Sequence, residues 1–152
     1  MKKTLIAMAT MLIGYTALAQ NTNQLVNSYI NVKNALINSD SKTASETITI
    51  LHNHITKEGS LAQNEDLQKA IHALKAATGL EKQRIAFAEI SPIIWKLVKN
   101  AESVTQDVYY QYCPMKKAYW LSTEKEIKNP YYGSSMLNCG KVVETKNSKV
   151  KA

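Results

Sequence analysis

The sequence predicts a mainly α-helical fold: an antiparallel four-helix bundle with a short irregular or β-rich C-terminal segment packed on it. Two observations support this fold class. Apolar residues recur at three- and four-residue steps through most of residues 21–101, which is the spacing of one buried helix face. After Glu102 the composition changes to β-branched and aromatic residues separated by turn signals. Four amphipathic helices joined by short turns are typical of an antiparallel bundle.

The first two helices are predicted over residues 21–38 and 42–57. The break between them, Ser39-Asp40-Ser41, offers residues that can cap the start of the second helix. The run Thr47-Ile48-Thr49-Ile50 also alternates between polar and apolar residues, so a strand is the alternative there. Gly59-Ser60 is expected to end the second helix.

Two further helices are predicted over residues 64–78 and 80–101. Asn64 is suited to cap the third helix, and the acidic residues after it suit the positive end of a helix dipole. Gly79 is expected to follow its C-terminus. Ser91-Pro92 interrupts the fourth pattern, where we expect a kink or a new helix start, because proline lacks the amide hydrogen.

The C-terminal segment is predicted to contain short strands near residues 104–112, 118–121 and 141–145. Asn129-Pro130-Tyr131-Tyr132-Gly133 is a turn signal, since asparagine can bond its own backbone, proline presets φ and glycine tolerates positive φ. The dense tyrosines are expected to pack this small region. Residues 146–152 are predicted to be a disordered tail.

The N-terminus resembles a signal peptide over residues 1–19. Met1-Lys2-Lys3 is basic, a short apolar run follows, and Ala17-Leu18-Ala19 has the small-residue pattern of a cleavage site. We expect a periplasmic or secreted protein whose single domain covers residues 20–145, with no membrane span in the mature chain. An uncleaved anchor is the weaker alternative. Loss of Lys2 and Lys3 lowers the net charge from +7 to +5, and the scattered lysines do not favour nucleic-acid binding.

Four sulfur residues near the C-terminus are the candidate functional residues. Cys113 and Met115 form one pair of soft ligands, and Met136 and Cys139 form another. Thiolates and thioethers suit Cu(I) or Ag(I), so together they are a candidate metal site. The alternative is a Cys113–Cys139 disulfide, which composition alone favours in an exported chain, with the methionines filling the core.

Other chemistry is not indicated. His52 and His54 are two residues apart and would lie on nearly opposite faces of a helix, so a surface or packing role is expected for them and for His72. Zinc-protease, phosphate-loop and nucleophile-elbow motifs are absent from the sequence. We therefore predict a protein that is not an enzyme.

Several of these segments resemble a family of exported domains of unknown function from Bacteroidetes-type bacteria. The resemblance covers most of residues 22–145 and rests on Tyr112-Cys113-Pro114-Met115, Trp120-Leu121-Ser122, Asn129-Pro130-Tyr131-Tyr132-Gly133, Met136-Leu137 and Cys139-Gly140. Such domains also occur fused to the adaptor subunits of copper/silver efflux pumps. The resemblance implies a role in heavy-metal handling, with an efflux adaptor or another envelope protein as partner.

The Cys113-Pro114-Met115 run also resembles a short metal-binding module near the start of copper-transport proteins. In that module His-Pro follows the methionine, whereas Lys116-Lys117 follows here, so no histidine ligand is carried over. The leading hypothesis is an accessory module that binds Cu(I) or Ag(I) through the four sulfur residues. The disulfide-stapled structural or interaction domain is the alternative.

Overall fold

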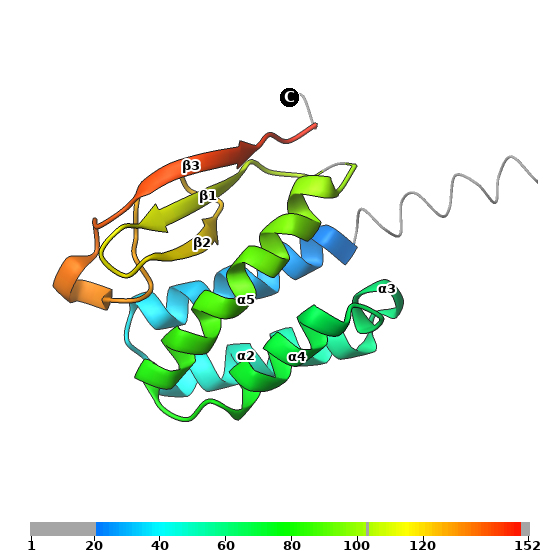
Figure 1. Ribbon diagram of the computed structural model, residues 1–152, viewed down its shortest axis with the longest axis horizontal. Coiled ribbons are helices and arrows are strands. Elements are labelled where there is room, and N and C mark those ends of the chain that lie inside the picture. Colours follow the sequence, from blue (N-terminus) through cyan, green and yellow to red (C-terminus); the bar gives the residue numbers. More distant parts are fainter. Residues whose placement is uncertain (1–20, 103, 150–152) are drawn as a thin grey trace, which may run out of the picture.

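The computed structural model describes residues 21–102 and 104–149. The predicted signal peptide, residues 1–19, lies outside the described residues, as do residues 150–152 of the predicted tail. The described part of the N-terminal helix spans residues 21–37. The elements that follow it are α2 (Ser41–Lys57), α3 (Gly59–Ala62), α4 (Glu65–Ala76), α5 (Leu80–Asn100), β1 (Val108–Cys113), β2 (Ala118–Ser122), the 3-10 helix η1 (Gly133–Met136) and β3 (Lys141–Lys146) (Figure 1).

The elements are stacked in layers (Figure 1). The sheet lies over α5 and the N-terminal helix, and α2 and α4 lie on the far side of those two helices. A continuous apolar core joins the layers, from Leu51 of α2 to Trp120 of β2. The prediction of a mainly helical chain with a small β segment near its C-terminus is therefore confirmed. The finer prediction of an antiparallel four-helix bundle stays a prediction.

Two helix starts are formed by the predicted capping residues. The Asp40 carboxylate accepts a 3.0 Å hydrogen bond from the Thr43 amide at the start of α2, and the Asn64 side chain accepts one of 3.0 Å from Leu67 at the start of α4. Residues 47–50 are helical, so the strand alternative is wrong. Helix α3 was not predicted: it forms a single turn beginning at Gly59, where the sequence indicated only a break.

Helix α5 runs through Pro92 without a new start. The residue before the proline, Ser91, is fully buried, and its hydroxyl donates a 2.6 Å hydrogen bond to the Phe87 carbonyl. The same hydroxyl lies 2.7 Å from the Tyr29 hydroxyl of the N-terminal helix. Tyr29 in turn accepts a hydrogen bond of 3.2 Å from the Leu121 amide of β2. This buried chain of hydrogen bonds ties both helices to the sheet.

The sheet is antiparallel, with strand order β2-β1-β3. Side chains alternate between its two faces. On the face toward α5, the rings of Trp95, Tyr110 and Tyr119 form a parallel stack with centroid distances of 4.8 Å. Tyr112 continues the series against Tyr119 at 4.5 Å. The dense aromatic residues therefore serve as packing between sheet and helix, as the sequence indicated.

The segment between β2 and β3 covers the other face of the sheet. Gln111 of β1 is fully buried there, and its side-chain amide lies within 3.1–3.3 Å of the carbonyl oxygens of Glu124, Lys125 and Glu126. Trp120 is also fully buried on this face and contacts Tyr131 edge to face, with centroids 5.9 Å apart. The hydrogen bonds of the Gln111 side-chain amide and the contact between Trp120 and Tyr131 thus hold the covering segment against the sheet.

Lys33 is a buried lysine where the N-terminal helix meets the end of β2. Its side chain is 2% exposed, and its ammonium group donates a 3.2 Å hydrogen bond to the Ser122 hydroxyl. Burial lowers the pKa of Lys33 to about 8, against the smaller opposing influence of Glu124. Sequence analysis did not predict this burial.

Strand β3 forms one edge of the sheet, and most of its side chains are exposed. Its last residue, Lys146, donates hydrogen bonds to the carbonyl oxygens of Lys99 and Ala101 at the end of α5, at 3.1 and 2.6 Å. Beyond the strand, the Ser148 amide donates to the Asp107 carboxylate at 2.7 Å. Lys146 and Ser148, both within the predicted tail, are therefore tied to the domain.

Candidate thiol site

Cys113 and Cys139 lie side by side, although 26 positions separate them. Cys113 is the last residue of β1 and is fully buried, whereas Cys139 lies between η1 and β3 and is half-buried. Their Sγ atoms are 3.2 Å apart and both cysteines are free. A disulfide bond is about 2.05 Å long, so the two atoms are close enough to bond or to ligate one ion after a small movement.

A four-residue turn shapes the Cys113 side of the site. Cys113 pairs with Ala118 across the hairpin, and Lys117 adopts a positive φ of 52° that closes the turn. The turn directs the Lys116 amide toward Cys113, with nitrogen and Sγ 3.4 Å apart. The Met115 amide also faces both sulfur atoms. The turn therefore surrounds the thiols with backbone N–H donors.

The predicted Asn-Pro-Tyr-Tyr-Gly turn positions the Cys139 side. Asn129 is fully buried, and its Oδ1 accepts a 2.8 Å hydrogen bond from the Tyr131 amide, as expected for an asparagine turn. Its Nδ2 donates a 2.8 Å hydrogen bond to the Cys139 carbonyl, and its backbone amide donates to Leu137 at 2.7 Å. Asn129 also donates toward the Cys113 sulfur. One side chain thus holds both cysteines in place.

The helices anchor this turn through Arg84 of α5. Its Nε donates to the Pro130 carbonyl at 2.9 Å, and its Nη2 donates to the Leu36 carbonyl at 2.8 Å. Gly133 lies against Arg84 and Ser39 and has a φ of 54°. A Cβ atom at this position would lie 2.7 Å from the Ser39 hydroxyl oxygen. The glycine is required by both the positive φ and the close approach. The site is therefore built on the helical layers.

Gly140 fits the chain closely against the sheet directly after Cys139. A Cβ atom at this position would lie 2.7 Å from the Trp120 ring and 3.1 Å from the Tyr112 carbonyl oxygen. Real Cβ atoms do not approach other atoms so closely, because the repulsion is steep. A residue without a side chain is therefore needed to bring Cys139 up to β1.

The two thiols differ in acidity. Burial raises the pKa of Cys113, but hydrogen bonds from the Cys139 thiol, the Lys116 amide and Asn129 together lower it below its usual range. The pKa of Cys139 is raised, chiefly by its hydrogen bond to Cys113 and then by burial. Because the two sulfurs share one proton, the pair loses its first proton more readily than its second. Cys113 is the sulfur that the surrounding donors favour as a thiolate.

The two predicted methionine ligands lie in the turns that carry the cysteines. Met115 is in the hairpin turn and is 66% exposed, while Met136 ends η1 and is half-buried. The Cys139 amide donates a 3.2 Å hydrogen bond to the Met136 carbonyl, so these two residues share one turn. The exposure of Met115 excludes a core-filling role for that side chain.

The histidines lie away from the sulfur residues, on α2 and α4. His52 and His72 face each other across the two helices, an association that sequence analysis missed because it considered only the neighbouring pair His52 and His54. Within residues 21–102 and 104–149, no group of three or more His, Cys, Asp or Glu side chains is placed to hold a metal ion.

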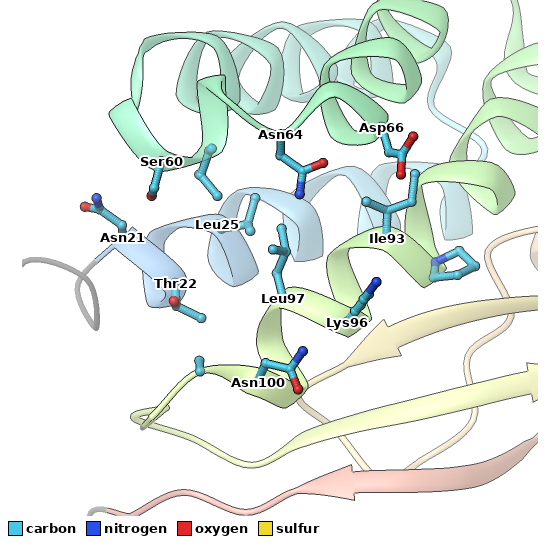
Figure 2. Close-up of a pocket in the computed structure, with 13 residues that line it drawn as sticks. Asn21, Thr22, Leu25, Ser60, Asn64, Asp66, Ile93, Lys96, Leu97 and Asn100 are labelled. Atoms are coloured by element: carbon cyan, nitrogen blue, oxygen red, sulfur yellow. The ribbon is translucent and has the colours of Figure 1, made fainter.

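A cavity of about 440 Å³ lies between the helices, at the start of the N-terminal helix (Figure 2). Helix α3, the start of α4 and the second half of α5 also line it. Leu25, Ile93 and Leu97 contribute apolar surface, and Lys96 and Asp66 contribute charge. Nothing in this mixed lining selects one class of ligand.

Comparison with known proteins identifies a family for the helical part of the chain. A family model described as Protein of unknown function (DUF3347) matches residues 25–106. The match ends before β1, so Cys113 and Cys139 lie outside it. No curated protein and no solved structure matches the chain. No helix among the described residues is long and apolar enough to cross a membrane. Because the family match covers more than half of the 152 residues, the chain belongs to the DUF3347 family.

Proposed function

We propose that the protein is an exported, non-enzymatic module that handles heavy metals by binding Cu(I) or Ag(I). Cys113 and Cys139 supply two thiolate ligands, and Met115 and Met136 supply thioethers. The observation that carries this proposal is the pair of free thiols with Sγ atoms 3.2 Å apart. Thiolates and thioethers are soft ligands that prefer these monovalent ions to magnesium or calcium.

The surroundings of the thiols support ion binding. Backbone and Asn129 N–H groups stabilise negative charge on Cys113, which favours the thiolate that a metal ligand requires. Cys113 is fully buried, which limits access by water, while half-buried Cys139 leaves a route for an ion to enter. Met115 follows Cys113 by two residues and is exposed. Its flexible side chain can therefore close over an ion bound at the thiols.

The place of action and the partner follow from the sequence. The signal peptide predicted over residues 1–19 directs the chain to the periplasm or outside the cell. The resemblance to domains fused to copper/silver efflux adaptors favours such an adaptor, or another envelope protein, as partner. The scattered lysines do not favour nucleic acid.

The test is Cu(I) titration of the reduced, untagged protein against a chromogenic competitor. We expect about one equivalent to bind, with loss of binding in Cys113→Ser and Cys139→Ser. Met115→Leu and Met136→Leu are expected to weaken affinity, and exposed Val143→Leu serves as the control that leaves it unchanged. Binding that survives replacement of both cysteines would exclude this ligand set.

A disulfide-stapled structural or interaction domain is the second candidate. The 3.2 Å approach of the two sulfurs favours it as well, since oxidation needs little movement. A loop of this length would contribute on the order of 3 kcal/mol to stability. In that case, protein isolated from the envelope lacks the mass of two hydrogens and takes up no Cu(I) even after reduction.

A further inference from the structure

His52 of α2 and His72 of α4 face each other at the surface between the two helices. Nε2 of His52 lies 3.2 Å from Nδ1 of His72. The ring centroids are 4.9 Å apart and the ring planes are inclined by 71°. His52 is half-buried and His72 is exposed, so solvent reaches the pair. This pair is separate from the sulfur residues in sequence and in ligand type.

The distances match those of two imidazoles bound to one metal ion. Zinc–nitrogen bonds of about 2.0–2.1 Å place two ligand nitrogens about 2.9–3.3 Å apart for bond angles between 90° and 109°. The same geometry places the ring centroids about 4.5–5.2 Å apart. The observed 3.2 and 4.9 Å lie within both intervals. A straight head-on hydrogen bond would hold the centroids about 5.5 Å apart, so the rings are inclined to each other instead.

The two helices hold the pair in this arrangement. Next to His52 and His72 in sequence, Leu51 of α2 and Ile71 of α4 are fully buried in the core, which fixes both backbones. One turn from the pair, Lys75 of α4 donates to the Thr49 hydroxyl of α2, so this ammonium group is engaged with Thr49. The two imidazoles are therefore presented by rigid elements with little cost of ordering.

We propose that His52 and His72 form a binding site for a divalent transition-metal ion of borderline softness, such as Zn²⁺ or Cu²⁺. Imidazole nitrogen suits these ions, whereas the sulfur residues suit monovalent ions. Two imidazoles fill two positions and water fills the rest, because the site is open to solvent. Binding replaces the hydrogen bond between the rings and moves one imidazole proton to the outward nitrogen. The ion then links α2 to α4.

The test is a thermal melt with and without Zn²⁺, on untagged protein whose thiols are removed as ligands by oxidation to the disulfide or by Cys113→Ser with Cys139→Ser. At a Zn²⁺ concentration tenfold above the dissociation constant, the melting temperature is expected to rise by about 4 °C. The rise is expected to disappear in His52→Gln and in His72→Gln. The matched control His54→Gln, on α2, is expected to keep it.

A second measurement does not depend on the folding of the variants. In the imidazole nitrogen spectrum of the same thiol-blocked protein, Zn²⁺ is expected to shift the resonances of His52 and His72 and to leave His54 in place. Equal shifts at all three histidines, no shift at all, or a Zn²⁺ stabilisation that persists in His52→Gln would each overturn the proposal. Because the thiols are absent from this assay, its result is independent of the Cu(I) proposal.

Discussion

The side-chain amide of Asn129 donates a 2.8 Å hydrogen bond to the carbonyl oxygen of Cys139. This contact fixes the backbone that presents the Cys139 thiol to Cys113. Asn129 also accepts from the Tyr131 amide, so one fully buried side chain both closes the turn and positions the thiol. Local turn chemistry and the geometry of the candidate site are thus set by the same residue.

Asn129→Asp is expected to weaken both stability and thiolate formation. The carboxylate keeps the acceptor for Tyr131 but loses the donor to the Cys139 carbonyl, and a buried unpaired carbonyl costs about 1–3 kcal/mol. Negative charge beside Cys113 would also raise the pKa of that thiol. Urea unfolding measures the first effect. Asn138→Asp, at an exposed position one residue before Cys139, is the control and should change stability by less than about 0.5 kcal/mol.

The thiol pair is expected to titrate in two steps, one below and one above the ordinary cysteine value of about 8.5. The Cys139 thiol lowers the pKa of Cys113, so Cys139→Ser should raise the pKa of the remaining thiol. Cys113 is the main cause of the raised pKa of Cys139, so Cys113→Ser should lower it. Thiolate absorbance in the ultraviolet follows both steps. A single step at the ordinary value would contradict the observed contact.

Lys33→Met is expected to stabilise the protein at neutral pH. Burial lowers the pKa of Lys33 to about 8 in the folded state, so below that pH the folded protein holds a charge that water solvates better. An unfolded lysine has a pKa near 10.4, so between pH 8 and this value the unfolded chain holds one proton more than the folded protein. The free energy of unfolding therefore rises with pH in that window. Across this window the free energy of unfolding rises by roughly 3 kcal/mol.

The measurement for Lys33 is the free energy of unfolding across that pH window. The advantage of Lys33→Met over the natural protein should be largest at pH 7 and shrink toward pH 10.5. Lys69→Met, at an exposed position on α4, is the matched control and should show no such trend. An advantage that does not change with pH would mean that improved packing, and not the buried charge, is responsible.

Gly140→Ala is expected to destabilise the domain by about 1–3 kcal/mol, because the new methyl group would lie 2.7 Å from the Trp120 ring. Movement of the chain to relieve this contact would separate Cys139 from Cys113 and weaken Cu(I) binding. Gly59→Ala is the control: nothing lies within 4 Å of its Cβ position, and alanine there should be neutral or stabilise by less than about 1 kcal/mol. Thermal melts of the two variants decide the comparison.

The sequence predicted best what depends on neighbouring residues. The caps at Asp40 and Asn64, and the turn built by Asn129, follow from side chains bonding to nearby backbone, and each is present. Two alternatives were predicted at Pro92, a kink or a new helix start. The new start is wrong, because α5 continues through this residue. The local preference of proline was overcome because Ser91 and Ile94, which flank Pro92 on one helix face, are buried in the core.

Contacts between distant segments were not predictable in the same way. The 26-residue spacing of Cys113 and Cys139 is compatible with many distances between their sulfur atoms. The hairpin, the Asn129 turn and the close fit of Gly140 together bring these atoms to 3.2 Å. The pairing of His52 with His72 depends on how α2 crosses α4, which no periodicity encodes. The burial of Lys33 was not predictable because it depends on contact with Ser122 of β2, which is distant in sequence.

The contact between Gly140 and Trp120 also places an intrinsic fluorophore next to the thiols. Trp120 is a fully buried indole whose ring borders the residue after Cys139, whereas the second described indole, Trp95, lies in the stack with Tyr110 on the opposite face of the sheet. We therefore expect the emission of Trp120 to respond to changes at the thiols, including quenching by a heavy ion that binds there. Because that indole belongs to the natural chain, occupancy of the thiol site can be followed by fluorescence without any attached dye.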